Sequence, residues 1–340
     1  MHLRRRTIQQ IQTFAWFAAV YVVIGIVWEY LEMSAVSLSG PGAGLGVGLT
    51  LALLEESRIA DFTRSMSFSA AVLVKSAVFV GVIAVPVCSI GLIVGLIHGH
   101  TLSEFREWIS SAEFAVELIA IYLIHLGIIF FRHLNRLLGP GTLMRYVTGR
   151  YHKPSAERRV FMFLDLKSST MIAEAMGKER YYAFLNASFR DMSEPILDRS
   201  AEIYQYVGDE VILTWPLESG IRDANCIRVF VEILGQIQSR REYYLHAFGR
   251  VPEFKAALHY GDVIAAEIGD IKKEICYFGD VLNTTARIQA KCNELGHLLI
   301  ASEELVARLQ LPLSVKSEAL GQIALRGKAE ATALVGLYAS

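Results

Sequence analysis

Two aspartates stand where apolar segments end, and together they suggest metal chemistry. Asp165 closes the apolar run Phe161–Leu164, and Asp209 lies at the tip of a predicted β-hairpin within Tyr204–Leu213. A hard cation such as Mg²⁺ prefers oxygen ligands and is commonly held by one or two carboxylates together with substrate phosphates. Either aspartate alone is better explained as a turn or cap residue. The pair, taken with the elements described next, predicts a divalent metal site.

The residues after Asp165 add a second feature of such a site. They lead into a predicted helix, whose free backbone N–H groups and dipole can accept an anion. An ordinary N-cap at Ser169 or Thr170 is the alternative, and the two interpretations are compatible. The segment consists of Lys167, Ser168, Ser169 and Thr170.

A third element is a helix predicted to begin near Asp280. It places Asn283 and Arg287 four residues apart on one face. An amide and a guanidinium together suit a ribose and a developing phosphate charge. In isolation this segment is better explained as a solvated helix face with a surface arginine.

The chain of 340 residues is 53% hydrophobic and only 20% charged, which is apolar for a soluble protein of this size. The excess lies in the first 135 residues, where four apolar runs approach the length that spans a bilayer. One of them is rich in glycine, which is tolerated where membrane helices pack closely. The predicted spans are Ile11–Met33, Val36–Leu54, Ala70–Ile97 and Phe114–Phe131.

Basic residues predict the orientation of these spans, because loops rich in arginine stay in the cytoplasm. With four spans, the N-terminus and everything after the last span are cytoplasmic, and we expect a multi-pass protein of the inner cell membrane. The four cysteines show no metal or redox spacing. The net charge of −1 says nothing useful about partners, and no nucleic-acid partner is expected. The arginines are Arg4, Arg5, Arg6, Arg58, Arg64, Arg132 and Arg136.

Ionisable residues inside predicted spans are costly and often functional. Glu29, Lys75 and Glu117 are better explained as lying near the interfaces and snorkelling. His125 is deeper. We interpret it as a neutral, hydrogen-bonded histidine, with haem or metal ligation as the alternative.

The periodicity predicts three parts: a transmembrane domain at 1–133, a connector with a short amphipathic helix at 134–159, and an α/β globule at 160–340. The connector helix is expected over Leu143–Tyr151. Strands are predicted at 160–164, 202–207, 211–215, 254–259, 263–268 and 274–278, with later ones near 297–300, 314–325 and 333–338. Helices are predicted at 178–198, 220–242 and 281–293.

Four ordered motifs lie between Val160 and about Tyr338: Phe163-Leu164-Asp165, Val207-Gly208-Asp209, His259-Tyr260-Gly261-Asp262-Val263, and Gly279-Asp280-Val281-Leu282-Asn283-Thr284-Thr285-Ala286-Arg287. Together they resemble the catalytic domain of the class III nucleotidyl cyclases. The resemblance implies an α+β, ferredoxin-like βααββαβ core and an obligatory head-to-tail homodimer with two shared sites. It also implies two ions of Mg²⁺ or Mn²⁺ per site.

The resemblance further implies roles for individual residues. Asp165 and Asp209 would bind the metal ions, with the backbone of Leu166 also near a metal. Asn283 and Arg287 would act on a nucleotide held by the partner subunit. The cluster Arg326-Gly327-Lys328 resembles the family's Lys-Gly-Lys, so Arg326 or Lys328 would bind the triphosphate, alongside Lys167, Ser168, Ser169 and Thr170.

Base choice rests on two positions in this family, which here are Gln205 and Cys276. A glutamine amide both donates and accepts, so it suits adenine or guanine. Cysteine leans towards guanine by family analogy. Bacterial members without lysine here mostly resemble adenylyl cyclases, so we expect an adenylate cyclase that acts on ATP, with guanylate cyclase activity on GTP as the alternative.

Two other function classes share part of this pattern. Gly208-Asp209-Glu210 resembles the hairpin of diguanylate cyclases, but the Asn-Thr-Thr-Ala-Arg helix has no place there. A non-catalytic nucleotide receptor would have lost one of the four key residues, and none is lost. Because four spans exceed what an anchor needs, we expect the membrane domain to sense an unknown ligand or the lipid bilayer and to regulate the catalytic domain.

Overall fold

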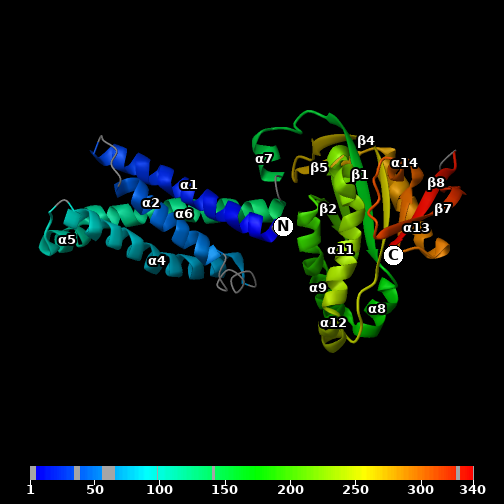
Figure 1. Cartoon of the computed structure of the whole chain (residues 1–340), viewed down its shortest axis with the longest axis horizontal. Helices are drawn as coiled ribbons and strands as arrows, with labels where there is room; N and C mark the ends of the chain where they lie inside the picture. The colour runs from blue at the N-terminus through cyan, green and yellow to red at the C-terminus, as the bar shows by residue number, and fades with distance from the viewer. Residues whose placement is uncertain are drawn as a thin grey trace. The chain divides into compact units, whose positions relative to one another are not determined.

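The computed structural model describes residues 5–33, 39–55, 66–97, 99–139, 142–326 and 330–339 (Figure 1). The chain divides into two compact units, Met1–Leu137 and Leu138–Ser340. Most of the connector segment therefore belongs to the second unit. Several residues singled out in the sequence lie outside the described residues: Arg4, Arg58, Arg64 and Lys328.

The first unit consists of helices. They are α1 (Arg5–Met33), α2 (Ser39–Glu55), α4 (Phe68–Ile97), α5 (Leu102–Ile109) and α6 (Ala112–Leu138). The four predicted apolar runs are helical where they are described, whereas α5 was not predicted. A capping box between Thr101 and Glu104 begins α5, and its Thr-x-x-Glu pattern is a signal that could have revealed it.

Glycines of α2 allow the backbone of α1 to approach closely. A Cβ atom on Gly44 would lie 2.1 Å from the carbonyl oxygen of Tyr21, and one on Gly48 would lie 2.6 Å from that of Phe17. Any larger side chain would therefore separate the two helices. The glycine-rich segment thus serves close helix packing, as its composition predicts.

One helix in the described residues is long and apolar enough to cross a membrane, namely Ala112–Asn135 within α6. The apolar stretches Phe14–Val27 in α1 and Gly40–Leu53 in α2 are shorter. Of the four predicted spans, the described residues therefore support one, the span within α6.

Two of the ionisable residues in the predicted spans are described. His125 is buried, and its Nδ1 lies 2.7 Å from the Tyr21 hydroxyl, which agrees with a packed, hydrogen-bonded histidine. Glu29 is buried beside Gly40, so its side chain packs between helices instead of extending from their surface, and its position near an interface stays a prediction. The side chains of Lys75 and Glu117 lie outside the described part.

The second unit is built on one mixed sheet. Its strands run in the order β2-β3-β1-β4-β6-β8-β7, with β5 paired to β4. Only β4 and β6 are parallel among these pairs. The strands are β1 (Ser155–Leu166), β2 (Glu202–Val207), β3 (Glu210–Pro216), β4 (Phe254–Ile268), β5 (Glu274–Phe278), β6 (Leu299–Ser302), β7 (Val315–Ile323) and β8 (Thr332–Ala339).

Helices cover both faces of this sheet. Alternate residues of β1 point to opposite faces of the sheet and belong to two different hydrophobic cores. Met162 and Leu164 pack with α9 and α11 on one face, and Phe161 packs with α13 on the other. The succession β1, α8, α9, β2, β3, α11, β4 is the βααββαβ order that the resemblance implies. The helices are α7 (Thr142–Val147), α8 (Ser169–Met176), α9 (Lys178–Asp198), α10 (Leu217–Ile221), α11 (Asn225–Ser239), α12 (Arg241–Phe248), α13 (Asp280–Leu295) and α14 (Glu303–Val306).

Several predicted elements differ from the structure. The two strands predicted at 254–259 and 263–268 are one continuous strand, because β4 pairs with β1 on both sides of Gly261. The helix predicted at 220–242 is interrupted, since Asp223 and Ala224 have positive φ of 51°. The connector helix α7 ends at Val147 rather than continuing to Tyr151.

Candidate active site

Three charged side chains meet at the end of β1. Asp165 pairs with Glu210 across to β3 and with Lys255 across to β4. Directly opposed residues in antiparallel strands point to the same face, so all three side chains share one face of the sheet. Lys255 Nζ lies 3.2 Å from Asp165 Oδ2. Gln289 Nε2 of α13 donates a 2.7 Å hydrogen bond to Glu210 Oε2.

Asp209 joins this group from the turn between β2 and β3. Gly208 makes the turn possible with a φ of 64°, a conformation that favours glycine. Asp209 Oδ2 is buried and has no hydrogen-bond partner. Burial, a hydrogen bond with Asp209 and the charge of Asp209 raise the pKa of Asp165 above its ordinary value, and Lys255 opposes this only in part. Two close carboxylates and one unpartnered oxygen make a site short of positive charge.

This shortage fits a divalent cation. No group of three or more His, Cys, Asp or Glu side chains in the described part of the chain is arranged to hold a metal ion by itself. A carboxylate pair can hold Mg²⁺ or Mn²⁺ when substrate phosphates and water supply the remaining oxygens. Asp165 and Asp209 are therefore suited to a metal that arrives with a phosphorylated ligand.

The segment after Asp165 is only partly as expected. Leu166 is buried, and its place beside Asp165 leaves its backbone near the carboxylate pair. The backbone N–H of Lys167 is not free, because it donates to the carbonyl of Glu253 at 2.8 Å. Helix α8 begins at Ser169, with Ser168 as the N-cap at a φ of 60° and without a side-chain capping bond. The predicted N-cap at Ser169 or Thr170 is thus one or two residues late.

Helix α13 directs its functional candidates away from this carboxylate group. Gln289 faces Glu210, and an α-helix turns about 100° per residue, so Arg287 lies about 200° around the helix from Gln289. Asn283 lies about 40° from Arg287 by the same count, on the same side. Asn283 is exposed and Arg287 is half-buried. Within the described residues, no hydrogen bond or ion pair joins either residue to Asp165 or Asp209.

The two base-choice positions lie on different strands. Gln205 is exposed on β2, and Cys276 is half-buried on β5. A bulge interrupts β2, because Ile203 pairs with Leu213 whereas Gln205 pairs with its neighbour Ile212. The extra residue, Tyr204, turns Gln205 onto the face of the sheet that α13 covers.

Arg326 is exposed immediately after the buried Leu325, and Lys328 lies outside the described residues. The sequence reasoning missed Lys255, Glu210 and Gln289. A lysine between Phe254 and Ala256, inside an otherwise apolar strand, is a signal that could have identified Lys255.

Comparisons with known proteins give the family of this chain. Residues 152–335 match the family described as the adenylate and guanylate cyclase catalytic domain. Adenylate cyclase 2 of Rhizobium meliloti (strain 1021) is 41% identical over 212 residues, which cover 62% of this chain and 58% of that protein. An adenylate cyclase of Anabaena cylindrica is 23% identical over 186 residues, covering 53% of this chain and 36% of that protein. The chain thus spans little more than half of the first relative.

A solved structure supports the fold. The structure of a bacterial light-regulated adenylyl cyclase matches with a TM-score of 0.53 at 17% identity, over 67% of this chain and 66% of that one. At this identity the likeness concerns the fold alone.

The crowded carboxylates predict a trade-off between stability and metal binding. Asp209→Asn removes one negative charge, so the metal-free variant should unfold at a higher temperature than the wild type at pH 7. In the presence of pyrophosphate, Mn²⁺ should raise the unfolding temperature of the wild type but not that of the variant, because ligands that bind only the folded state stabilise it. Thermal unfolding with and without Mn²⁺ measures both effects.

The matched control is Asp262→Asn, which alters an exposed aspartate paired with Arg158 at the surface. It should leave the response to Mn²⁺ unchanged. An equal response to Mn²⁺ in Asp209→Asn and the wild type would contradict the assignment of Asp209 as a metal ligand.

Proposed function

The chain belongs to the adenylate and guanylate cyclase family, and from that premise we propose that it converts ATP to 3′,5′-cyclic AMP and pyrophosphate. The reaction is an in-line attack of the ribose 3′-hydroxyl on the α-phosphorus. The bond from the α-phosphorus to pyrophosphate breaks, and the hydroxyl proton is released. Both matched relatives carry the name adenylate cyclase, which supports ATP as the substrate.

The residues of the chain divide this chemistry between them. Asp165, Asp209 and the backbone of Leu166 would hold two ions of Mg²⁺ or Mn²⁺, which lower the pKa of the attacking hydroxyl and offset phosphate charge. Arg287 stabilises charge that develops only in the transition state, and Asn283 orients the ribose. Lys255, beside Asp165, is placed to contact the triphosphate once metal replaces it at the carboxylate. Arg326, Lys328 and the Lys167–Thr170 segment complete the phosphate site.

The observation that carries the proposal is the direction of α13. Gln289 faces the carboxylates of its own chain, so Asn283 and Arg287 on the other side of the helix must serve a different site. A two-fold homodimer supplies that site, because each chain then presents its α13 to the carboxylate pair of its partner. We therefore propose that catalysis requires the dimer and that each active site takes residues from both chains.

A mixing experiment tests the shared site. Asp209→Ala and Arg287→Ala should each abolish turnover as pure homodimers. Co-expressed and isolated as mixed dimers, they should regain about half of wild-type activity, since each mixed dimer has one intact site of two. The measurement is cyclic nucleotide produced from ATP with Mn²⁺ by tandem-affinity-purified protein.

Both variants must remain folded and dimeric by light scattering, which serves as the control. No recovery in proven mixed dimers would contradict the shared site. Substantial product from pure Asp209→Ala would contradict the cyclase assignment itself.

Gln205 and Cys276 are proposed to contact the base. The amide of Gln205 can accept from the adenine N6 amino group or, after rotation, donate to guanine O6. Cys276 favours the second candidate, guanylate cyclase activity on GTP, because a thiol replaces the aspartate usual for adenine. We favour ATP because the relatives are adenylate cyclases.

Substitution of Gln205 tests this reading. Gln205→Lys should raise the preference for ATP over GTP, and Gln205→Glu should lower it, each on the order of tenfold, as expected for one polar contact to the base. Specificity constants for both triphosphates measure the change. Equal preferences in the two variants would show that Gln205 does not select the base.

We further propose that the first unit lies in the cell membrane in several passes, with the catalytic unit in the cytoplasm, and that it regulates catalysis. Large apolar side chains point outward from its helices, among them Leu73, Val85, Leu123 and Phe130. Soluble proteins rarely expose so much apolar surface, whereas lipid covers it at no cost.

Membrane attachment and regulation are separable by experiment. The full chain should stay with the membrane fraction after alkaline carbonate washing, whereas a fragment beginning at residue 138 should be released. The two should also differ in specific activity on ATP. Release of the full chain by carbonate would contradict membrane insertion, and equal activity across lipid compositions would contradict regulation.

A further inference from the structure

The short helix α7 is tied by its side chains to two strands of the catalytic unit. The two terminal guanidinium nitrogens of Arg145 donate to the carboxylate of Glu202 on β2, Nη1 at 3.1 Å. The next residue, Tyr146, donates its hydroxyl to the carbonyl of Lys273, just before β5, at 3.1 Å. Two consecutive residues of α7 thus reach β2 and β5.

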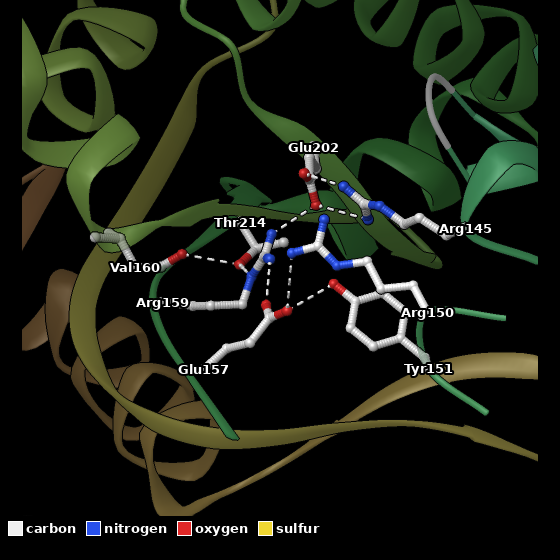
Figure 2. A network of polar contacts seen from close by, with 8 residues as sticks. All are labelled: Arg145, Arg150, Tyr151, Glu157, Arg159, Val160, Glu202 and Thr214. Atoms are coloured by element: carbon white, nitrogen blue, oxygen red, sulfur yellow. Dashed lines mark hydrogen bonds and ion pairs between the residues drawn. The ribbon is translucent and has the colours of Figure 1, made fainter. Parts of the chain in front are cut away.

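These contacts extend into a buried network of charges (Figure 2). Arg159 of β1 is only 1% exposed and donates to Glu202 at 2.6 Å and to Glu157 at 2.9 Å. Its Nε donates to the Thr214 hydroxyl at 3.0 Å. Burial acts to raise the pKa of Glu202, but Arg145 and Arg159 hold this pKa below its ordinary value. Glu202 is therefore a carboxylate shared by two arginines.

The same network borders both base-choice positions. The bulge at Tyr204 places Glu202 and Gln205 on the same face of β2, three residues apart. The Arg159 guanidinium lies 4.7 Å from the ring centroid of Tyr277, which follows Cys276 on β5. The ring of Tyr204 packs against that of Tyr277 at 5.1 Å.

No main-chain pairing fixes the spacing of these two strands. β2 pairs with β3, and β5 pairs with β4, so the two are not hydrogen-bonded neighbours in the sheet. Side chains connect them instead. Tyr204 packs against Tyr277, and α7 contacts Glu202 of β2 through Arg145 and the carbonyl of Lys273, just before β5, through Tyr146. A bidentate arginine pair such as Arg145–Glu202 is directional, so it holds a position as well as a charge.

We propose that α7 is a positioning element for base recognition: Arg145 and Tyr146 set the separation of Gln205 and Cys276, and thereby the preference for one purine nucleotide over the other. This inference rests on the proposed function, since it assigns a determinant of specificity to that same site. Arg145 is a positioning residue, because it acts through Glu202 and does not touch the nucleotide.

The experiment compares Arg145→Ala with Arg150→Ala in the full chain. Arg150 is the matched control because it comes from the same segment. Its side chain is 63% exposed, and its guanidinium lies 3.7 Å from the Glu157 carboxylate, which is too far for a hydrogen bond. The first readout is the rate at which iodoacetamide alkylates Cys276, followed on the peptide that contains it. The second is the ratio of kcat/KM for ATP to that for GTP.

Arg145→Ala should speed the alkylation of Cys276 several-fold and change the ATP-to-GTP ratio on the order of tenfold, mainly through KM. Arg150→Ala should leave both unchanged. Tyr146→Phe removes one hydroxyl only and should shift both readouts in the same direction by less, which covers the case in which Arg145→Ala fails to fold. The double variant Arg145→Ala with Glu202→Gln should be no worse than the more severe single variant, because each single substitution already removes the Arg145–Glu202 ion pair.

The inference is overturned if Arg145→Ala and Tyr146→Phe match Arg150→Ala in both readouts, or if they lower kcat alone with an unchanged ratio. Alkylation of Cys276 does not need turnover. If the wild type makes no cyclic nucleotide, the proposed function fails while the alkylation rates still test the position of β5. If the wild type is active and the rates do not change, the positioning role fails while the function stands.

Discussion

The register of β1 between β3 and β4 is the constraint on which the rest of the catalytic unit depends. It sets Asp165 between Glu210 and Lys255 at one end of the strand, and it places Arg159 on the same face near the other end. A slip of one residue would turn both side chains into the core under α9 and α11, where Met162 and Leu164 now pack. The apolar alternation of β1 therefore positions the charges as well as the core.

The carboxylates at the end of β1 are a poor arrangement for a protein alone and a good one for a protein with metal and phosphate. Asp209 keeps a buried oxygen without a partner, and Lys255 compensates only part of the negative charge. Such local frustration is common where a ligand completes the electrostatics. The site also lacks a second group of residues, because Asn283 and Arg287 of α13 face away from these carboxylates. Metal, nucleotide and a second chain would resolve both.

At the other end of the same face, side chains connect segments that the sheet does not. Glu202 and Glu157 share the buried guanidinium of Arg159, and α7 joins through Arg145 and Tyr146. Removing one member would leave a charge buried without its partner, which is far more costly than the loss of a surface ion pair. The network therefore resists local rearrangement, and its contacts join α7 both to β2 and to the residue that precedes β5.

The sequence by itself determined the elements whose signals are local. The limits of β2, β5 and α9 agree with alternation or helical periodicity, and the motifs around Asp165, Asp209 and Arg287 identified the family, because turn residues and spacings within a short segment carry that information. Only the tertiary structure decided that Lys255 and Glu210 flank Asp165, that Gln289 rather than Arg287 faces them, and that α7 bridges β2 and β5. Those facts depend on strand register, on a bulge at Tyr204 and on helix rotation, which arise when distant segments pack and leave no mark in any one of them.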